Sequence, residues 1–193
     1  MKNVQEWVSR HRINTSVVWG IVLLGFAKPA PFPVAMGLPL LILGEAIRIW
    51  SSGTIQKDTT LARYGPYSIT RNPLYLGNFL IGLSLCVIMG MSWMILILFV
   101  SGFYFIYQPT IEAEEKKLMQ TFGKDFMIYC AQVPRFFPSV LRLPLAGRAP
   151  SAGRTSSAGV RFSWVLVVQH REHWTCLAIL GVIFFFMLMG GSV

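Results

Sequence analysis

The sequence predicts an all-α, polytopic integral membrane protein with about five transmembrane helices, and three observations lead to this fold class. Hydrophobic residues make up 54% of the 193 positions. Charged residues make up only 13%, about half the usual ~25%. The apolar residues gather in runs of about 15–18 residues, close to the length of a membrane span. Because lipid offers no hydrogen-bond partners to the backbone, each run is expected to be helical.

The apolar runs and their connectors fit a chain that passes back and forth through a bilayer. We expect the spans to cover residues 13–27, 33–50, 74–91, 92–107 and 174–189. The short Gly90-Met91-Ser92 connector leaves room only for a hairpin between the third and fourth spans. The loops 52–73 and 109–172 carry many Lys and Arg residues, and basic loops stay in the cytoplasm. The N-terminus is therefore expected inside and the C-terminus outside.

The chain divides into a core and a C-terminal extension. We expect a membrane core at 1–138, with four transmembrane helices and a cytoplasmic helix. A basic flexible linker at 139–161 follows, and then an interfacial segment with a C-terminal transmembrane helix at 162–193. The net charge of +9 on an apolar chain favours anionic lipids at the cytoplasmic face as partners. Nucleic acid is not expected, because the linker arginines lack interleaved aromatic residues or a binding motif. The oligomeric state is not predicted.

A polar helix start lies just before the third span. Asn72 suits an N-cap and Pro73 suits the first helical position. The free amides of this helix start, together with Arg71, would attract an anionic group such as a carboxylate. Tyr75, four residues after Arg71, would rise toward the same pocket. The alternative, that Arg71 only reaches lipid phosphates, stays open at this point.

An acidic cluster follows the fourth span. Helical spacing pairs Glu112 with Lys116, and Glu114 with Lys117, whereas Glu115 has no comparable basic partner nearby. Adjacent glutamates lie about 100° apart on a helix, so at most one of them points straight into a pocket while the other flanks it. The local pattern alone also fits a solvated charged face.

Taken together, the two clusters resemble the isoprenylcysteine carboxyl methyltransferase family, which is related to the integral-membrane phospholipid methyltransferases. The resemblance covers about residues 40–138 and includes the closing segment 133–138, which is similar to the family's exit from this region. The other matching positions are Gly65, Pro66, Tyr67, Arg71, Asn72, Pro73, Tyr75, Gly77, Glu114, Glu115, Leu118, Phe122, Gly123 and Tyr129.

The resemblance implies a cytoplasmic-side pocket for S-adenosylmethionine as methyl donor, with S-adenosylhomocysteine as product and no metal. The acceptor would be lipid-like or isoprenoid-linked and would be methylated on a carboxylate oxygen or on an amine. The implied catalytic residues are Arg71, Glu114 and Glu115. The implied cofactor-binding residues are Tyr67, Arg71, Asn72, Pro73, Tyr75, Gly77 and Glu114.

Two positions depart from the better-studied eukaryotic and archaeal members. Asn72 stands where those members have histidine, and it resembles the bacterial variant, so a bacterial inner membrane is expected. Thr110 stands where they tend to carry an arginine. The substrate-facing half of the site is therefore expected to differ from theirs.

Other polar residues have simpler explanations. Glu45 and Arg48, three residues apart in the second span, are expected to form a structural ion pair, with a catalytic role as the alternative. Lys57 fits a lipid headgroup contact or a contact with the donor carboxylate, with snorkelling to the membrane surface as the simpler interpretation. His170 and His173 lack further ligands at a suitable spacing, so no metal site is expected there.

Two rival functions remain at the level of sequence. Membrane sterol reductases share a related arginine-histidine-proline segment but bind a nicotinamide cofactor. Their usual arginine-aspartate pair is missing here, and Asn78 stands after Gly77 where they have a glutamate. The second rival is a non-catalytic membrane interaction protein on the same scaffold. Detection of the cofactor that binds would separate the three.

Overall fold

In the part of the chain that it describes, the computed structural model contains helices and no strands, which confirms the all-α class for those residues. It describes residues 31–54, 60–90, 92–138 and 162–169, together with positions 15, 18–20, 22 and 181. The helices are α3 (Pro31–Ser52), the short 3-10 helix η1 (Gly65–Ser68), α4 (Pro73–Ile88), α5 (Trp93–Phe122), α6 (Lys124–Gln132) and α7 (Trp164–Gln169).

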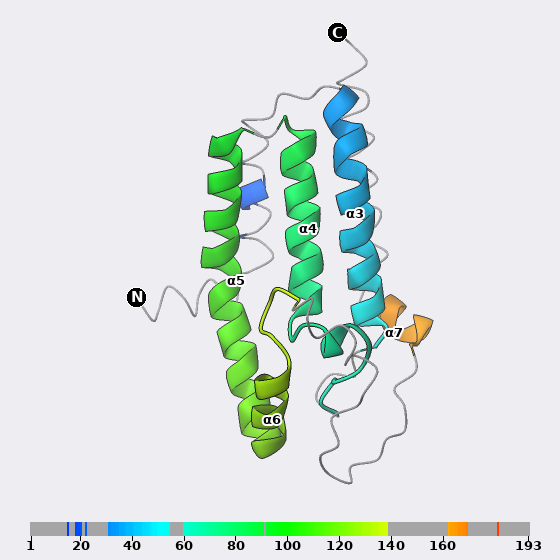
Figure 1. Cartoon of the computed structure of the whole chain (residues 1–193), viewed down its shortest axis with the longest axis vertical. Helices are drawn as coiled ribbons and strands as arrows, with labels where there is room; N and C mark the ends of the chain where they lie inside the picture. The colour runs from blue at the N-terminus through cyan, green and yellow to red at the C-terminus, as the bar shows by residue number, and fades with distance from the viewer. Residues whose placement is uncertain are drawn as a thin grey trace.

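The three long helices α3, α4 and α5 stand side by side and run alternately down, up and down in Figure 1. The tight connection after α4 enforces this return, because Gly90 adopts a φ of 85° that other residues rarely accept. The end of α3, the start of α4 and the end of α5 therefore meet at one end of the bundle. Helices α6 and α7 also lie at that end (Figure 1).

The apolar helices fit the predicted spans in part. By length and composition, α5 is the one helix within the described ranges that is long and apolar enough to cross a bilayer, while α4 is apolar but shorter. Large apolar side chains on α5, such as Trp93, Ile97 and Phe105, are exposed, as a lipid-facing surface requires. Most of 174–189 and most of 13–27 lie outside the described residues, so the count of five spans remains a prediction.

Several further expectations also fall outside the described residues. These are the linker 139–161, Lys57, His170 and His173. Of the extension 162–193, the structure describes residues 162–169, which include α7, and position 181. Ser163, just before α7, donates its backbone amide to the carbonyl of Gly53 at 2.9 Å, so the extension contacts the end of α3.

Helices α3 and α4 approach each other closely because glycines face one another at their contact. A Cβ atom on Gly77 would lie 2.7 Å from the carbonyl oxygen of Gly44 and 2.5 Å from Cγ of Arg48. Arg48 lies 3.5 Å from Glu45 on its own helix and donates to the side-chain oxygen of Asn78 on α4. The predicted structural pair is therefore present, and it ties α3 to α4.

Helix α5 joins the predicted fourth span to the acidic cluster without a break. It passes through Pro109, which cannot donate an amide hydrogen bond to the preceding turn, and a proline at such a position bends a helix. In Figure 1 the C-terminal half of α5 leans toward the start of α4. This bend brings the glutamates of α5 over the beginning of α4.

Residues 133–138, here called the strap, follow α6 and return toward the start of α4. Phe136 of the strap lies 5.8 Å from Phe79 of α4 and 5.8 Å from Phe103 of α5, measured between ring centroids. Phe79 and Phe103 are themselves 5.1 Å apart in an edge-to-face arrangement. The strap is therefore anchored between α4, which begins beside Arg71, and α5, which carries the glutamates.

Candidate functional site

A cavity lies between the start of α4, the second half of α5, and α6. The polar clusters that the sequence places before the third span and after the fourth meet in its wall, although they are far apart along the chain. The lining residues are Tyr67, Arg71, Asn72, Pro73, Leu74, Tyr75, Glu114, Glu115, Leu118, Phe126 and Tyr129.

The loop that carries Arg71 is shaped by η1 and by the start of α4. Gly65 opens η1 with a φ of 59°, and α4 begins at Pro73 with Asn72 as its N-cap residue, as predicted. The side chain of Asn72, however, makes no capping bond. It donates instead to the carbonyl oxygen of Arg135 at 2.9 Å. Asn72 is therefore the N-cap residue by position, as predicted, but its side chain binds the strap, which offers that amide a different acceptor.

Two further hydrogen bonds fix the strap against the same loop. The backbone amide of Arg71 donates to the carbonyl oxygen of Pro134 at 2.9 Å. The hydroxyl of Thr70 donates to the carbonyl oxygen of Phe136 at 2.8 Å. With the Asn72 bond, three consecutive loop residues hold three consecutive carbonyls of the strap. The strap is thus held in place by the loop as well as by its phenyl ring.

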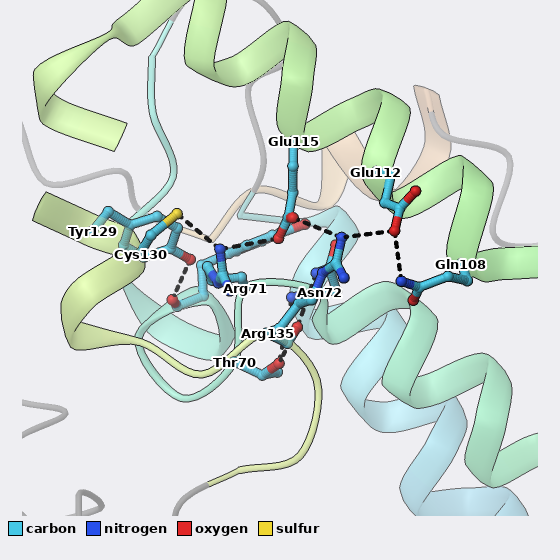
Figure 2. A network of polar contacts seen from close by, with 10 residues as sticks. Thr70, Arg71, Asn72, Gln108, Glu112, Glu115, Tyr129, Cys130 and Arg135 are labelled. Carbon is cyan, nitrogen blue, oxygen red and sulfur yellow. Dashed lines mark hydrogen bonds and ion pairs between the residues drawn. The ribbon is translucent and has the colours of Figure 1, made fainter. Parts of the chain in front are cut away.

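Glu115 lies between two arginines that come from different segments (Figure 2). Nη1 of Arg71 is 3.0 Å from Oε1 of Glu115, and Nη2 of Arg135 is 2.9 Å from Oε2. The side chain of Glu115 is 19% exposed, so water screens these ion pairs only in part. Nη1 of Arg71 also lies 2.8 Å from Sγ of Cys130. Each carboxylate oxygen of Glu115 thus has its own cation, which fixes the orientation of the group.

Glu114 faces a different partner from its neighbour. The phenol of Tyr75 donates to Oε1 of Glu114 at 2.8 Å, and the Tyr75 ring packs against Tyr107 at a centroid distance of 5.3 Å. The two adjacent glutamates therefore line one cavity but turn toward different sides of it. This agrees with the expectation that consecutive positions on a helix cannot point in the same direction.

Tyr129 supports the wall of the cavity from α6. Its hydroxyl donates to the backbone carbonyl of Tyr67 at 2.7 Å, and the residue is buried. Burial raises the pKa of Tyr129 well above its usual value, and the nearby positive charge of Arg71 opposes this only in part. The phenol therefore stays protonated and keeps its role as a donor at neutral pH.

Six of the seven predicted cofactor-binding residues line the cavity, and the seventh, Gly77, does not. Arg71, Glu114 and Glu115, the predicted catalytic residues, also line the cavity. Gly77 does not line it, because it lies one turn further along α4 and faces Gly44 of α3. Its lack of a side chain allows the two helices to approach, and its expected role in cofactor binding stays a prediction. The chemical roles of the other residues stay predictions.

Sequence reasoning missed Arg135 as part of the site. The segment 133–138 was interpreted only as the end of a motif, whereas Arg135 contacts Glu115 at 2.9 Å and lies 4.0 Å from Glu112. Glu112 in turn accepts a hydrogen bond from Gln108 at 2.7 Å. One signal was available: Glu115 lacked a basic partner at helical spacing, which predicts a partner from elsewhere in the chain.

Comparison with known proteins supports the resemblance seen in the motifs. The model of the isoprenylcysteine carboxyl methyltransferase (ICMT) family matches residues 35–120, which supports the family predicted from the sequence. This region contains the Arg71 loop and the glutamates, whereas the strap lies beyond it. The match supports a methyltransferase that acts on a prenylated or lipid-like acceptor and is associated with a membrane.

Two curated relatives have names that describe a phenotype. The cobalt-zinc-cadmium resistance protein CzcN of Cupriavidus metallidurans is 29% identical over 150 residues, which cover 70% of this chain and 67% of the relative. The nickel-cobalt-cadmium resistance protein NccN of Alcaligenes xylosoxydans xylosoxydans is 29% identical over 150 residues, covering 70% and 68%. No solved structure gives a significant match.

Among the residues that the structure describes, no three His, Cys, Asp or Glu side chains gather as a metal-ligand set.

Proposed function

We propose that this member of the ICMT family transfers a methyl group from S-adenosylmethionine to a lipid-like or isoprenoid-linked acceptor, at the cytoplasmic face of a bacterial inner membrane. The observation that carries the proposal is the cavity in which Arg71 and two glutamates converge beside aromatic side chains. The family match supports a methyltransferase, and the exposed apolar surface of α5 supports a membrane location.

The residues of the cavity fit the methyl donor. Nε of Arg71 is buried and has no hydrogen-bond partner among the described residues, so a donor is left for an incoming anionic group such as an amino-acid carboxylate. The carboxylate of Glu114 on the α5 side suits a cationic group, whereas Glu115 is already paired with two arginines. The rings of Tyr67 and Phe126 suit a flat heterocycle, which packs well on aromatic side chains.

When bound, S-adenosylmethionine supplies an electrophilic methyl group on a positively charged sulfur. Arg71 would hold its carboxylate, while Glu115, fixed by two arginines, holds Arg71 in a constant orientation. The hydrogen bond from Tyr75 orients the carboxylate of Glu114. If the acceptor is an amine, this carboxylate takes up the proton that the amine must lose. If the acceptor is itself a carboxylate, no proton transfer is needed.

The surroundings of the cavity suit an amphiphilic acceptor. Helix α5 exposes large apolar side chains before it reaches the glutamates, such as Ile97 and Phe105, so an apolar tail can lie along α5 while the polar head meets the glutamates. The net charge of +9 favours anionic lipids near the same face. The water-soluble donor would enter from the cytoplasmic side.

Isothermal titration of the detergent-purified full chain with S-adenosylhomocysteine tests the proposal. The wild type is expected to bind, and Arg71→Ala or Glu114→Gln to weaken binding by at least about tenfold, since a lost charge-assisted contact is worth roughly 1.5–3 kcal/mol. Each variant should also lower methyl transfer by orders of magnitude. Arg63→Ala and Asp125→Asn are matched controls, because these residues form an ion pair at 3.7 Å outside the cavity lining.

The same titration decides between the proposal and its rivals. Binding of a nicotinamide dinucleotide in place of S-adenosylhomocysteine would favour a reductase. Binding of neither would favour a non-catalytic membrane protein. Equal affinity of the Arg71→Ala variant and the wild type would contradict the site. Incubation of lipid extracts with labelled donor would then identify the acceptor and distinguish O- from N-methylation.

A further inference from the structure

Arg135 contacts the site from the strap, a segment in which the sequence predicted no site residue. Three features of its placement are independent of one another: its backbone is held by Asn72, its neighbour Phe136 is anchored between two helices, and its guanidinium contacts Glu115. A surface arginine that only snorkels would need none of these constraints. Together, these three constraints hold the side chain of Arg135 next to Glu115.

The effect of Arg135 reaches the cavity through Glu115. Arg135 itself does not line the cavity, whereas Glu115 and Arg71 both do. Glu115 binds Arg135 with Oε2 and Arg71 with Oε1, so the carboxylate connects the two guanidinium groups. Without Arg135, the carboxylate of Glu115 can rotate about its last bonds, because only one of its oxygens keeps a cationic partner. Arg71 would then lose the fixed partner that orients it.

We propose that Arg135 is a positioning residue, which fixes Glu115 and through it holds Arg71 in the orientation that receives the methyl donor. This inference rests on the proposed function for its ligand, but it concerns a residue outside the cavity. Asn72 takes part in the same way, because its side chain holds the carbonyl of Arg135 and so places the arginine. The strap therefore contributes to the donor site through Arg135.

Double-mutant cycles in the full-length protein test this inference. Arg135→Ala is expected to weaken S-adenosylhomocysteine binding by about tenfold, and Arg135→Lys, which keeps the charge, by no more than about threefold. In a Glu115→Gln background, Arg135→Ala should change the affinity by less than about twofold, because Arg135 acts through that carboxylate.

Glu112 offers a matched control inside the same network. It lies 4.0 Å from Arg135 but does not line the cavity. In a Glu112→Gln background, Arg135→Ala should therefore weaken binding by the full factor of about ten. A loss of the same size in both the Glu112→Gln and Glu115→Gln backgrounds would show that Arg135 acts by another route and would overturn the inference. Wild-type affinity in Arg135→Ala would overturn it as well.

A measurement without ligand separates this inference from the proposed function. The thermal midpoints of the wild type, both single variants and the Arg135→Ala/Glu115→Gln double variant report the coupling of the two side chains in the free protein. Non-additive midpoints are expected, and additive midpoints would overturn the positioning role. If the wild type bound no S-adenosylhomocysteine, the proposed function would fail, whereas this cycle would still decide whether Arg135 positions Glu115.

Discussion

The close approach of α3 and α4 at Gly77 leads to a quantitative prediction. In Gly77→Ala, the new Cβ atom would lie 2.7 Å from the carbonyl oxygen of Gly44 and 2.5 Å from Cγ of Arg48. The flexible Arg48 stem can move aside, but a backbone carbonyl cannot. To restore an ordinary contact of about 3.4 Å, the helices must separate locally by roughly 0.7 Å, and overpacking of this kind costs about 1–3 kcal/mol.

A second glycine allows the packing cost to be isolated. Alanine in place of helical glycine gains about 1 kcal/mol from backbone propensity, which would partly mask the effect at Gly77. Gly20 is also helical, and a Cβ atom there would meet no atom of the described residues within 4 Å. Gly20→Ala therefore has the propensity gain without the clash. The difference between the two alanine variants measures the packing term alone.

Thermal unfolding of both variants in the same detergent is the assay. A cost of 1–3 kcal/mol corresponds to a midpoint for Gly77→Ala that is about 2–12 °C below that of Gly20→Ala in a chain of this size. The Gly77 variant should also bind S-adenosylhomocysteine more weakly, because the start of α4 must shift. Equal midpoints for the two variants would refute the close contact between the helices.

Three further predictions concern the cavity wall and the strap. Tyr129→Phe removes the hydrogen bond to the carbonyl of Tyr67 and should lower stability by about 1–3 kcal/mol in thermal unfolding. Because burial raises the pKa of Tyr129 above its ordinary value of about 10, the unfolded chain loses this proton first, so stability should fall as pH rises above about 10, and less so in Tyr129→Phe. Tyr75→Phe should weaken S-adenosylhomocysteine binding by about tenfold in titration, since Glu114 loses an orienting bond, and unchanged affinity would contradict this role. Phe136→Ala should lower the unfolding free energy by on the order of 1–2 kcal/mol, because the half-buried ring leaves a gap between α4 and α5, and a midpoint equal to that of the wild type would exclude the anchor.

The sequence predicted the helical class and the local features well, because these depend on neighbouring residues. The start of α4 at Pro73 follows from the proline's fixed φ and missing amide, and it needs no tertiary information. The hairpin after α4 follows in the same way from a glycine in a short connector. The count of membrane spans depends on residues that the structure does not describe, so it remains a prediction.

The contacts between distant segments could be predicted only in outline. Composition cannot distinguish a glycine that lines a pocket from one that lets two helices touch, because the difference lies in which neighbour Gly77 faces. Likewise, the best local partner for the Asn72 side chain is its own helix, and only the folded strap offers the competing carbonyl of Arg135. The convergence of Arg71 with the glutamates was predicted from the motif resemblance, not from spacing alone.

The position of the strap in the chain has a consequence for biosynthesis. Arg135 is C-terminal to both helices whose residues it links, and the carbonyls that receive the loop 70–72 are translated with it. A nascent chain that has already released α4 and α5 from the ribosome therefore still lacks the group that orients Glu115. Glu115 can therefore take its fixed orientation only after the strap has also packed against the loop before α4.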